Sequence, residues 1–192
     1  MGEVTGKRIG VLAGAFNPVT CAHLALINAA LEVVDEAVCV VPRVYPHKEF
    51  YGAALQDRLE MLRLAGGRYR VEVTERGLFI DIARELRRTD PGAEIHFICG
   101  RDAAERIVTW DYGEPGAVER MFQEFHLLVA GRHGAYVPPE HLRPRVHPLP
   151  LAPGFDEVSS SEVRRRIAAG ESWERLVPEG VVELVRRIYR TS

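Results

Sequence analysis

A hydroxyl and an imidazole, those of Thr20 and His23, follow an apolar segment and a turn near the start of this chain. The apolar segment, residues 7–13, has the composition of a strand, and Gly14 would let the backbone after it bend and approach a ligand. Thr20 is a residue type that caps helices, so it and His23 are predicted to share the first turn of a helix. Beside the unpaired N–H groups of a helix N-terminus, this pair suits an anion such as phosphate. The alternative is a plain helix cap followed by a surface histidine, and the turn alone leaves both interpretations open.

A second helix start with suitable side chains lies near the other end of the chain. Ser159 and Glu162 have the spacing of a capping box. Ser160 and Ser161 would then place hydroxyls at the helix N-terminus, with Arg164 on the same face as Ser160. This arrangement favours binding of the more highly charged end of a polyphosphate. An ordinary capped, arginine-rich surface helix is the alternative.

The elements that must position these groups alternate along the chain. Strand, helix and strand follow one another within about 35 residues at the N-terminus, which predicts a βαβ unit and a parallel sheet. We therefore predict an α/β fold with a doubly wound parallel sheet, in a single domain over residues 1–192 with a C-terminal helical portion from about residue 159. The predicted strands are residues 7–13, 36–42, 69–74, 94–100, 125–130 and a short one around Val146. The predicted helices are residues 21–34, 54–65 and 81–88, with a further helical segment after Asp102 and then a loop that precedes residues 118–123.

Further candidates follow the carboxyl ends of predicted strands, the edge at which open parallel sheets bind ligands. Lys48, one of only two lysines in the chain, lies in the loop after residues 36–42 and could contact an anion or simply be solvated. Gly100 permits close backbone approach, and Asp102 could bind a ribose hydroxyl or cap the next helix. Trp110 could stack on a base or pyridine ring or fill the core.

Composition excludes several classes of function. The formal net charge of −2 provides no basic stripe for a nucleic-acid polymer, and no apolar run approaches the length of a membrane span. We expect a cytoplasmic protein, since no signal-peptide core begins the sequence. The three cysteines form no C-x-x-C pair and suggest neither a disulfide framework nor a zinc site. An oligomer is possible.

In order and spacing, these motifs resemble the nucleotidyltransferase superfamily with its H/T-x-G-H and I-S-S-T-x-x-R signatures, and within it the nicotinate/nicotinamide-mononucleotide adenylyltransferases. The match covers nearly the whole chain. Residues 13–18 (A-G-A-F-N-P) are similar to the family's G-G-T-F-D-P turn, residues 20–23 (T-C-A-H) to H/T-x-G-H, residues 46–48 to P-H-K, residues 97–102 (F-I-C-G-R-D) to F-I-x-G-x-D, Trp110 to the tryptophan that follows, and residues 158–164 (V-S-S-S-E-V-R) to I-S-S-T-x-x-R.

The resemblance implies a Rossmann-like fold and transfer of the adenylyl group of ATP to nicotinate or nicotinamide mononucleotide, with release of pyrophosphate, in NAD biosynthesis. It implies catalytic roles for His23, Lys48 and Arg164. Mg²⁺ would accompany ATP and bridge the phosphates with few protein ligands, so no protein metal site is predicted. ATP would be bound by Gly14, Ala15, Phe16, Thr20, His23, Gly100, Asp102, Ser159, Ser160, Ser161 and Arg164, and the acceptor by Asn17, Lys48, Phe79, Trp110 and Arg132.

One departure from the family pattern bears on the acceptor. Where the mononucleotide enzymes usually have Y-T-x-D-T-L, residues 78–83 read L-F-I-D-I-A, without either threonine. Transfer of a nucleotidyl group to another phosphate acceptor, such as phosphopantetheine, therefore stays open, and so does the choice between ATP and CTP. A non-catalytic nucleotide-binding protein is the alternative from another functional class.

Overall fold

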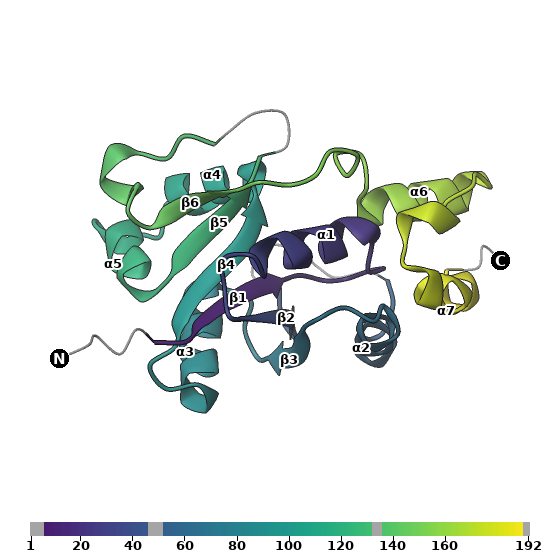
Figure 1. Ribbon diagram of the computed structural model, residues 1–192, viewed down its shortest axis with the longest axis horizontal. Coiled ribbons are helices and arrows are strands. Elements are labelled where there is room, and N and C mark those ends of the chain that lie inside the picture. Colours follow the sequence, from purple (N-terminus) through teal and green to yellow (C-terminus); the bar gives the residue numbers. More distant parts are fainter. Residues whose placement is uncertain (1–5, 46–51, 132–135, 190–192) are drawn as a thin grey trace.

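The computed structural model of the chain describes residues 6–45, 52–131 and 136–189. Its centre is a six-stranded sheet in the order β3-β2-β1-β4-β5-β6, with every neighbouring pair parallel (Figure 1). The predicted doubly wound parallel sheet is thus confirmed. The strands are β1 (Arg8–Ala13), β2 (Glu36–Pro42), β3 (Arg70–Thr74), β4 (Glu94–Gly100), β5 (His126–Ala130) and β6 (Val146–Leu149).

Helices cover both faces of the sheet, and the sheet divides the core in two. The helices are α1 (Cys21–Ala30), α2 (Leu55–Leu64), α3 (Phe79–Thr89), α4 (Arg101–Thr109), α5 (Ala117–Glu124), α6 (Ser160–Ala169) and α7 (Val182–Ile188), with short 3₁₀ turns at Glu140–Leu142, Glu174–Leu176 and Glu179–Val181. One apolar cluster joins the sheet to α1, α2, α6 and α7, and the other joins it to α3, α4 and α5. Strand β2 lies between the two helix layers, and its residues 37–41 are all buried, as expected for a continuously apolar strand of a parallel sheet.

The structure differs from the sequence-based expectations in two details near the first turn. The helix predicted over residues 21–34 ends at Ala30 and continues as a turn. The left-handed backbone conformation lies at Phe16, with φ +49°, and not at Gly14. A Cβ on Gly14 would meet the Phe16 ring at 3.6 Å, an ordinary contact, so Gly14 is not required by this backbone. The strained residue of the turn is therefore a buried phenylalanine.

The strand order determines where a ligand can bind. Strands β1 and β4 are neighbours, and the chain leaves β1 toward β2 on one side and β4 toward β5 on the other. The connections therefore diverge at this point and open a crevice at the carboxyl ends of the two strands. The C-terminal helices α6 and α7 lie beside α1 and α2 at one end of the molecule, as Figure 1 shows.

Candidate active site

A cleft of about 460 Å³ lies at the carboxyl ends of β1 and β4. The predicted phosphate turn and the start of α6 meet there, although they are far apart in the sequence. No carboxylate lines the cleft among the residues that the structure describes, so its polar walls consist of hydroxyls, backbone groups, an imidazole and a guanidinium. Its lining includes Gly14, Ala15, Thr20, His23, Tyr45, Phe79, Gly100, Arg106, Ser159 and Ser160.

Thr20 and His23 contact one another at the start of α1, as their spacing predicts. The backbone N–H of Thr20 donates to Nδ1 of His23 at 2.9 Å, and the Thr20 hydroxyl lies at the same distance from that nitrogen. Because Nδ1 accepts the backbone hydrogen, a neutral His23 ring carries its own hydrogen on Nε2. The ring is also packed against Phe16, with centroids 5.0 Å apart. His23 is therefore held in one orientation as a hydrogen-bond donor in the wall of the cleft.

The start of α6 is hydrogen-bonded directly to the turn. Ser159 caps the helix, since its hydroxyl accepts from the Glu162 N–H at 3.1 Å. The Ser160 hydroxyl donates to the carbonyl oxygen of Pro18 at 2.7 Å, and the Arg164 guanidinium donates to the carbonyl oxygen of Asn17. These bonds hold the N-terminal N–H groups of α6 beside the cleft, where they favour negative charge.

Asn17 lies beneath the cleft, where it connects three parts of the chain. Its side chain is buried, and its Oδ1 accepts from the Ala53 N–H at 3.1 Å and from the Tyr189 hydroxyl. An aspartate in the same place would accept the same two hydrogen bonds. Asn17 therefore holds the turn in position through these hydrogen bonds. It is not among the residues that line the cleft.

Arg58 of α2 is a functional candidate that the sequence did not reveal. It is only 4% exposed, and its Nη1 donates to the carbonyl oxygen of Ala15 at 3.2 Å and to the Tyr45 hydroxyl at 2.6 Å. A buried arginine stabilises the backbone that it contacts and places a positive charge behind the phosphate turn. In the sequence it lies on a helix rich in charged residues, where an arginine is unremarkable.

A second, more apolar cavity of about 200 Å³ adjoins the cleft. The two share a wall formed by Gly77, Phe79, Ala103 and Arg106. Phe79 stacks on the buried Phe97 ring, with centroids 4.0 Å apart and planes 9° apart. Trp110 lines the cavity and is 45% exposed, so it does not fill the core. The arrangement can hold a flat aromatic ring next to a polar, anion-binding cleft.

The remaining predicted site residues lie outside the two cavities or outside the described residues. Asp102 is exposed in the first turn of α4, whose cap is Gly100, and Ser161 accepts from Arg164 at 3.3 Å. Phe16 is buried under the turn. Lys48 and Arg132 lie outside the described residues. The roles assigned to all these residues stay predictions.

The cysteines are not arranged for nucleophilic chemistry. Burial raises the pKa of the Cys21 thiol and, more strongly, those of Cys39 and Cys99, which lie within strands. A raised pKa disfavours the thiolate, the reactive form. Cys39 and Cys99 therefore act as small core groups, whereas the half-buried Cys21 thiol donates to the carbonyl oxygen of Arg175 at 3.7 Å. Among the described residues, no helix has the length and apolar composition needed to cross a membrane.

Comparison with known proteins agrees with this geometry. The model of the cytidylyltransferase-like family matches residues 11–166. A relative from Thermus thermophilus, named "Probable nicotinate-nucleotide adenylyltransferase", is 34% identical over 95% of this chain and 100% of its own length. A relative of the same name from Exiguobacterium sibiricum is 30% identical over 93% of this chain and 95% of its own length.

Solved structures share the architecture as well. The nicotinic acid mononucleotide adenylyltransferase of Plasmodium falciparum, complexed with NaAD, superposes with a TM-score of 0.71, covering 94% of this chain and 95% of that one. The two are 18% identical, so this likeness supports the fold. The family match, the curated relatives and the crevice between β1 and β4 lead to one conclusion: the chain is a nucleotidyltransferase of the cytidylyltransferase-like family.

Proposed function

We propose that the chain transfers the adenylyl group of ATP to nicotinate mononucleotide and releases pyrophosphate, a step of NAD biosynthesis. The observation that carries this proposal is the pair of adjoining cavities, one polar and suited to phosphates and the other apolar and lined by Trp110 and Phe79. Relatives at 30% identity and above bear the name of this activity. A reaction that consumes ATP fits the cytoplasmic location expected from the sequence.

In the proposed reaction, an oxygen of the acceptor's phosphate attacks the α-phosphorus of ATP. The bond from that phosphorus to the oxygen that bridges the α- and β-phosphates breaks, and pyrophosphate leaves. A phosphate monoester is already ionised near neutral pH, so the reaction needs neither a general base nor a covalent protein intermediate. Catalysis then depends on in-line positioning and on neutralising the charge that builds up on the triphosphate.

The described residues can supply both effects. His23 would donate its Nε2 hydrogen to the phosphates near the scissile bond, and the N-terminus of α6, with Ser160, would bind the leaving end. Arg106 lies in the wall between the cavities, where a guanidinium can pair with the acceptor's carboxylate or phosphate. Mg²⁺ bound to the triphosphate would supply further charge neutralisation, held by phosphate oxygens and water because the described part of the cleft offers no carboxylate.

An acceptor panel tests the proposal. The chain is incubated with Mg²⁺, either ATP or CTP, and nicotinate mononucleotide, nicotinamide mononucleotide or phosphopantetheine, and pyrophosphate release is measured. We expect the highest kcat/KM with ATP and nicotinate mononucleotide. Faster turnover with phosphopantetheine, or ATP binding by calorimetry without product from any acceptor, would contradict the proposal.

A further inference from the structure

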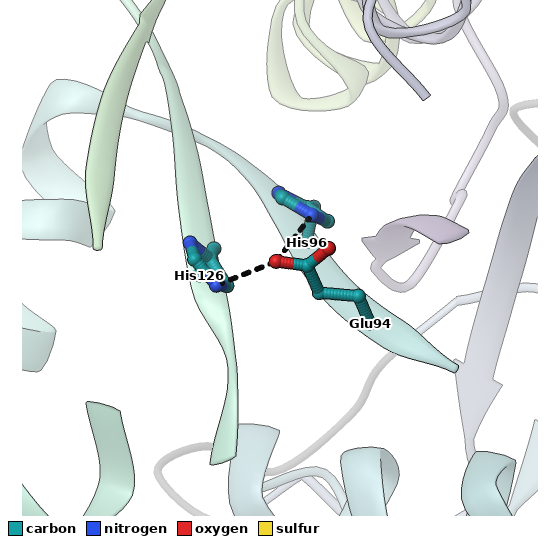
Figure 2. Close-up of side chains that lie close together, drawn as sticks. All are labelled: Glu94, His96 and His126. Atoms are coloured by element: carbon teal, nitrogen blue, oxygen red, sulfur yellow. Dashed lines mark ion pairs between the residues drawn. The ribbon is translucent and has the colours of Figure 1, made fainter. Parts of the chain in front are cut away.

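Three side chains that the proposed reaction does not use converge at the end of the sheet opposite the cleft. Glu94 and His96 are two residues apart at the start of β4 and therefore point to the same face, and His126 pairs with His96 in the register of β4 and β5. Figure 2 shows the Glu94 carboxylate reaching toward both rings. Its Oε1 lies 3.1 Å from Nε2 of His126 and 3.9 Å from Nε2 of His96.

His96 is the unexplained member of this cluster. The residue is 8% exposed, and neither of its ring nitrogens makes a hydrogen bond to the described part of the chain. Burying a polar group without a partner costs free energy, so a residue of this kind points to a partner other than the protein. Its ring stacks on that of His126, with centroids 4.6 Å apart, so the two imidazoles cover each other.

The hydrogen bonds of His126 determine which of its nitrogens carries the hydrogen. Nη1 of Arg145 lies 2.7 Å from Nε2 of His126, and an arginine can only donate. Nε2 must therefore accept, which leaves the hydrogen of the neutral ring on Nδ1. That hydrogen can be donated to Nε2 of His147, 3.1 Å away. This tautomer is the one that metal-binding histidines adopt when the second nitrogen is held by a neighbouring group.

Burial of the two rings also favours their uncharged form. Burial lowers the pKa of His126 to about 4, and the neighbouring His96 and Arg145 act in the same direction while Glu94 opposes them. Burial likewise lowers the pKa of His96. A lowered pKa favours the neutral imidazole, the form that donates a lone pair to a cation.

We propose that Glu94, His96 and His126 form a binding site for a divalent transition-metal ion of the zinc type. One carboxylate oxygen and two imidazole nitrogens are a ligand set that Zn²⁺ takes with water in its fourth position. Their three ligand atoms lie within 4.8 Å of one another. Bond lengths of about 2.0–2.1 Å at a tetrahedral ion separate ligand atoms by about 3.3 Å, so the ligand atoms must move closer together and the two stacked rings must turn until both lone pairs point at the ion.

This site differs from the Mg²⁺ of the proposed reaction in the type of its ligands and in its position in the fold. Mg²⁺ prefers oxygen ligands, and two of the three groups here are nitrogens. The ion would link the start of β4 to β5, and through the His126–His147 hydrogen bond to β6, at the end of the sheet opposite the cleft. Its role is to hold the strands of this edge together.

Arg145 would compete with the metal ion for Nε2 of His126. Its guanidinium occupies the direction of the Nε2 lone pair on His126, so the ion can bind only when that hydrogen bond opens. Replacing Arg145 should therefore tighten metal binding, whereas replacing the carboxylate should weaken it. Effects of opposite sign at two neighbouring residues are not expected from a general loss of structure.

The test uses the untagged full chain, freed of metal by chelation. Zn²⁺ affinity is measured by competition with a chromophoric chelator, and Co²⁺ is added in parallel to read the coordination geometry from its visible absorption. We expect one Zn²⁺ per chain, a loss of affinity of about 100-fold in Glu94→Gln, and a gain of about tenfold in Arg145→Met. An excess of Mg²⁺ should not displace the ion.

Glu119→Gln is the matched control, because Glu119 also faces a histidine, the exposed His141 at 3.4 Å. It should leave Zn²⁺ affinity unchanged. Circular dichroism checks that each variant is folded, which is expected for Glu94→Gln because that side chain is 43% exposed. Zn²⁺ affinity equal in wild type and Glu94→Gln would overturn the proposal. So would an intense near-ultraviolet thiolate band with Co²⁺, which would place the ion on a cysteine.

Discussion

His23 has two roles in this structure, and the pair of substitutions His23→Ala and His23→Asn can separate them. Its Nδ1 accepts from the Thr20 backbone at the start of α1, and its Nε2 is the proposed donor to the phosphates. His23→Ala removes both. Loss of a helix cap typically costs about 1 kcal/mol of stability, whereas loss of a preorganised donor to transition-state charge costs about 2.7–4 kcal/mol of the activation barrier.

These magnitudes predict a large kinetic effect in a protein that is still folded. A domain stable by about 5–15 kcal/mol stays almost entirely folded after losing about 1 kcal/mol. We therefore expect kcat to fall by about 100- to 1,000-fold with little change in the KM for ATP. Pyrophosphate release measures kcat, and urea unfolding of the same preparation measures stability.

His23→Asn is the control, because an asparagine places an acceptor near the position of Nδ1 and has no atom at that of Nε2. It should restore much of the stability while kcat stays low. The reasoning is refuted if His23→Ala keeps kcat within about tenfold of wild type, which would leave His23 as a helix cap alone.

Three further variants test other contacts. Tyr189→Phe removes one of two donors to Asn17 Oδ1 and should lower the free energy of unfolding by about 0.5–1.5 kcal/mol in urea; an unchanged value would contradict the role of this hydrogen bond. Trp110→Ala should raise the KM for the acceptor about tenfold or more and leave that for ATP unchanged, since stacking on a ring is worth about 1–3 kcal/mol; an equal rise for both substrates would argue against stacking. Hydrogen bonds from Arg165 and a neighbouring arginine lower the pKa of Glu162 from 4.5 to about 2, so this carboxylate stabilises α6 above pH 4.5 and loses that effect as the pH falls toward 2. Glu162→Gln should therefore lower Tm at pH 7, with a difference from wild type that shrinks on acidification; a constant difference would refute the assignment.

The fold was predictable because its signals are local. Strand β2 is an uninterrupted apolar run, and α6 begins at the Ser159 cap and ends at Gly170, whose φ is +67°. Each of these features depends on residues close in sequence. The pairing of Thr20 with His23 was predictable for the same reason, since helix geometry alone brings them together.

Other features depend on contacts between distant segments. No pattern near Asn17 indicates that its side chain accepts from Tyr189, and nothing around Arg58 shows that it is buried under the turn. The cluster of Glu94, His96 and His126 depends on the pairing register of β4 with β5, which the sequence does not specify. The spacing of Glu94 and His96 on a predicted strand does place both side chains on one face of the sheet. It indicates a metal site only when His126 is known to lie beside them.

The hydrogen bonds from α6 to the first turn also determine at which point during synthesis of the chain the candidate active site can form. Ser160 and Arg164 contact carbonyls 142 and 147 residues earlier in the chain, and Tyr189 contacts a side chain 172 residues earlier. All six strands precede these residues, so a ribosome extending the chain would release every strand of the sheet before the phosphate turn receives its last supports. Nucleotide binding that depends on these supports would then be acquired only after Tyr189 has been synthesised. A nascent chain that binds ATP would be one that has folded to its C-terminal helices.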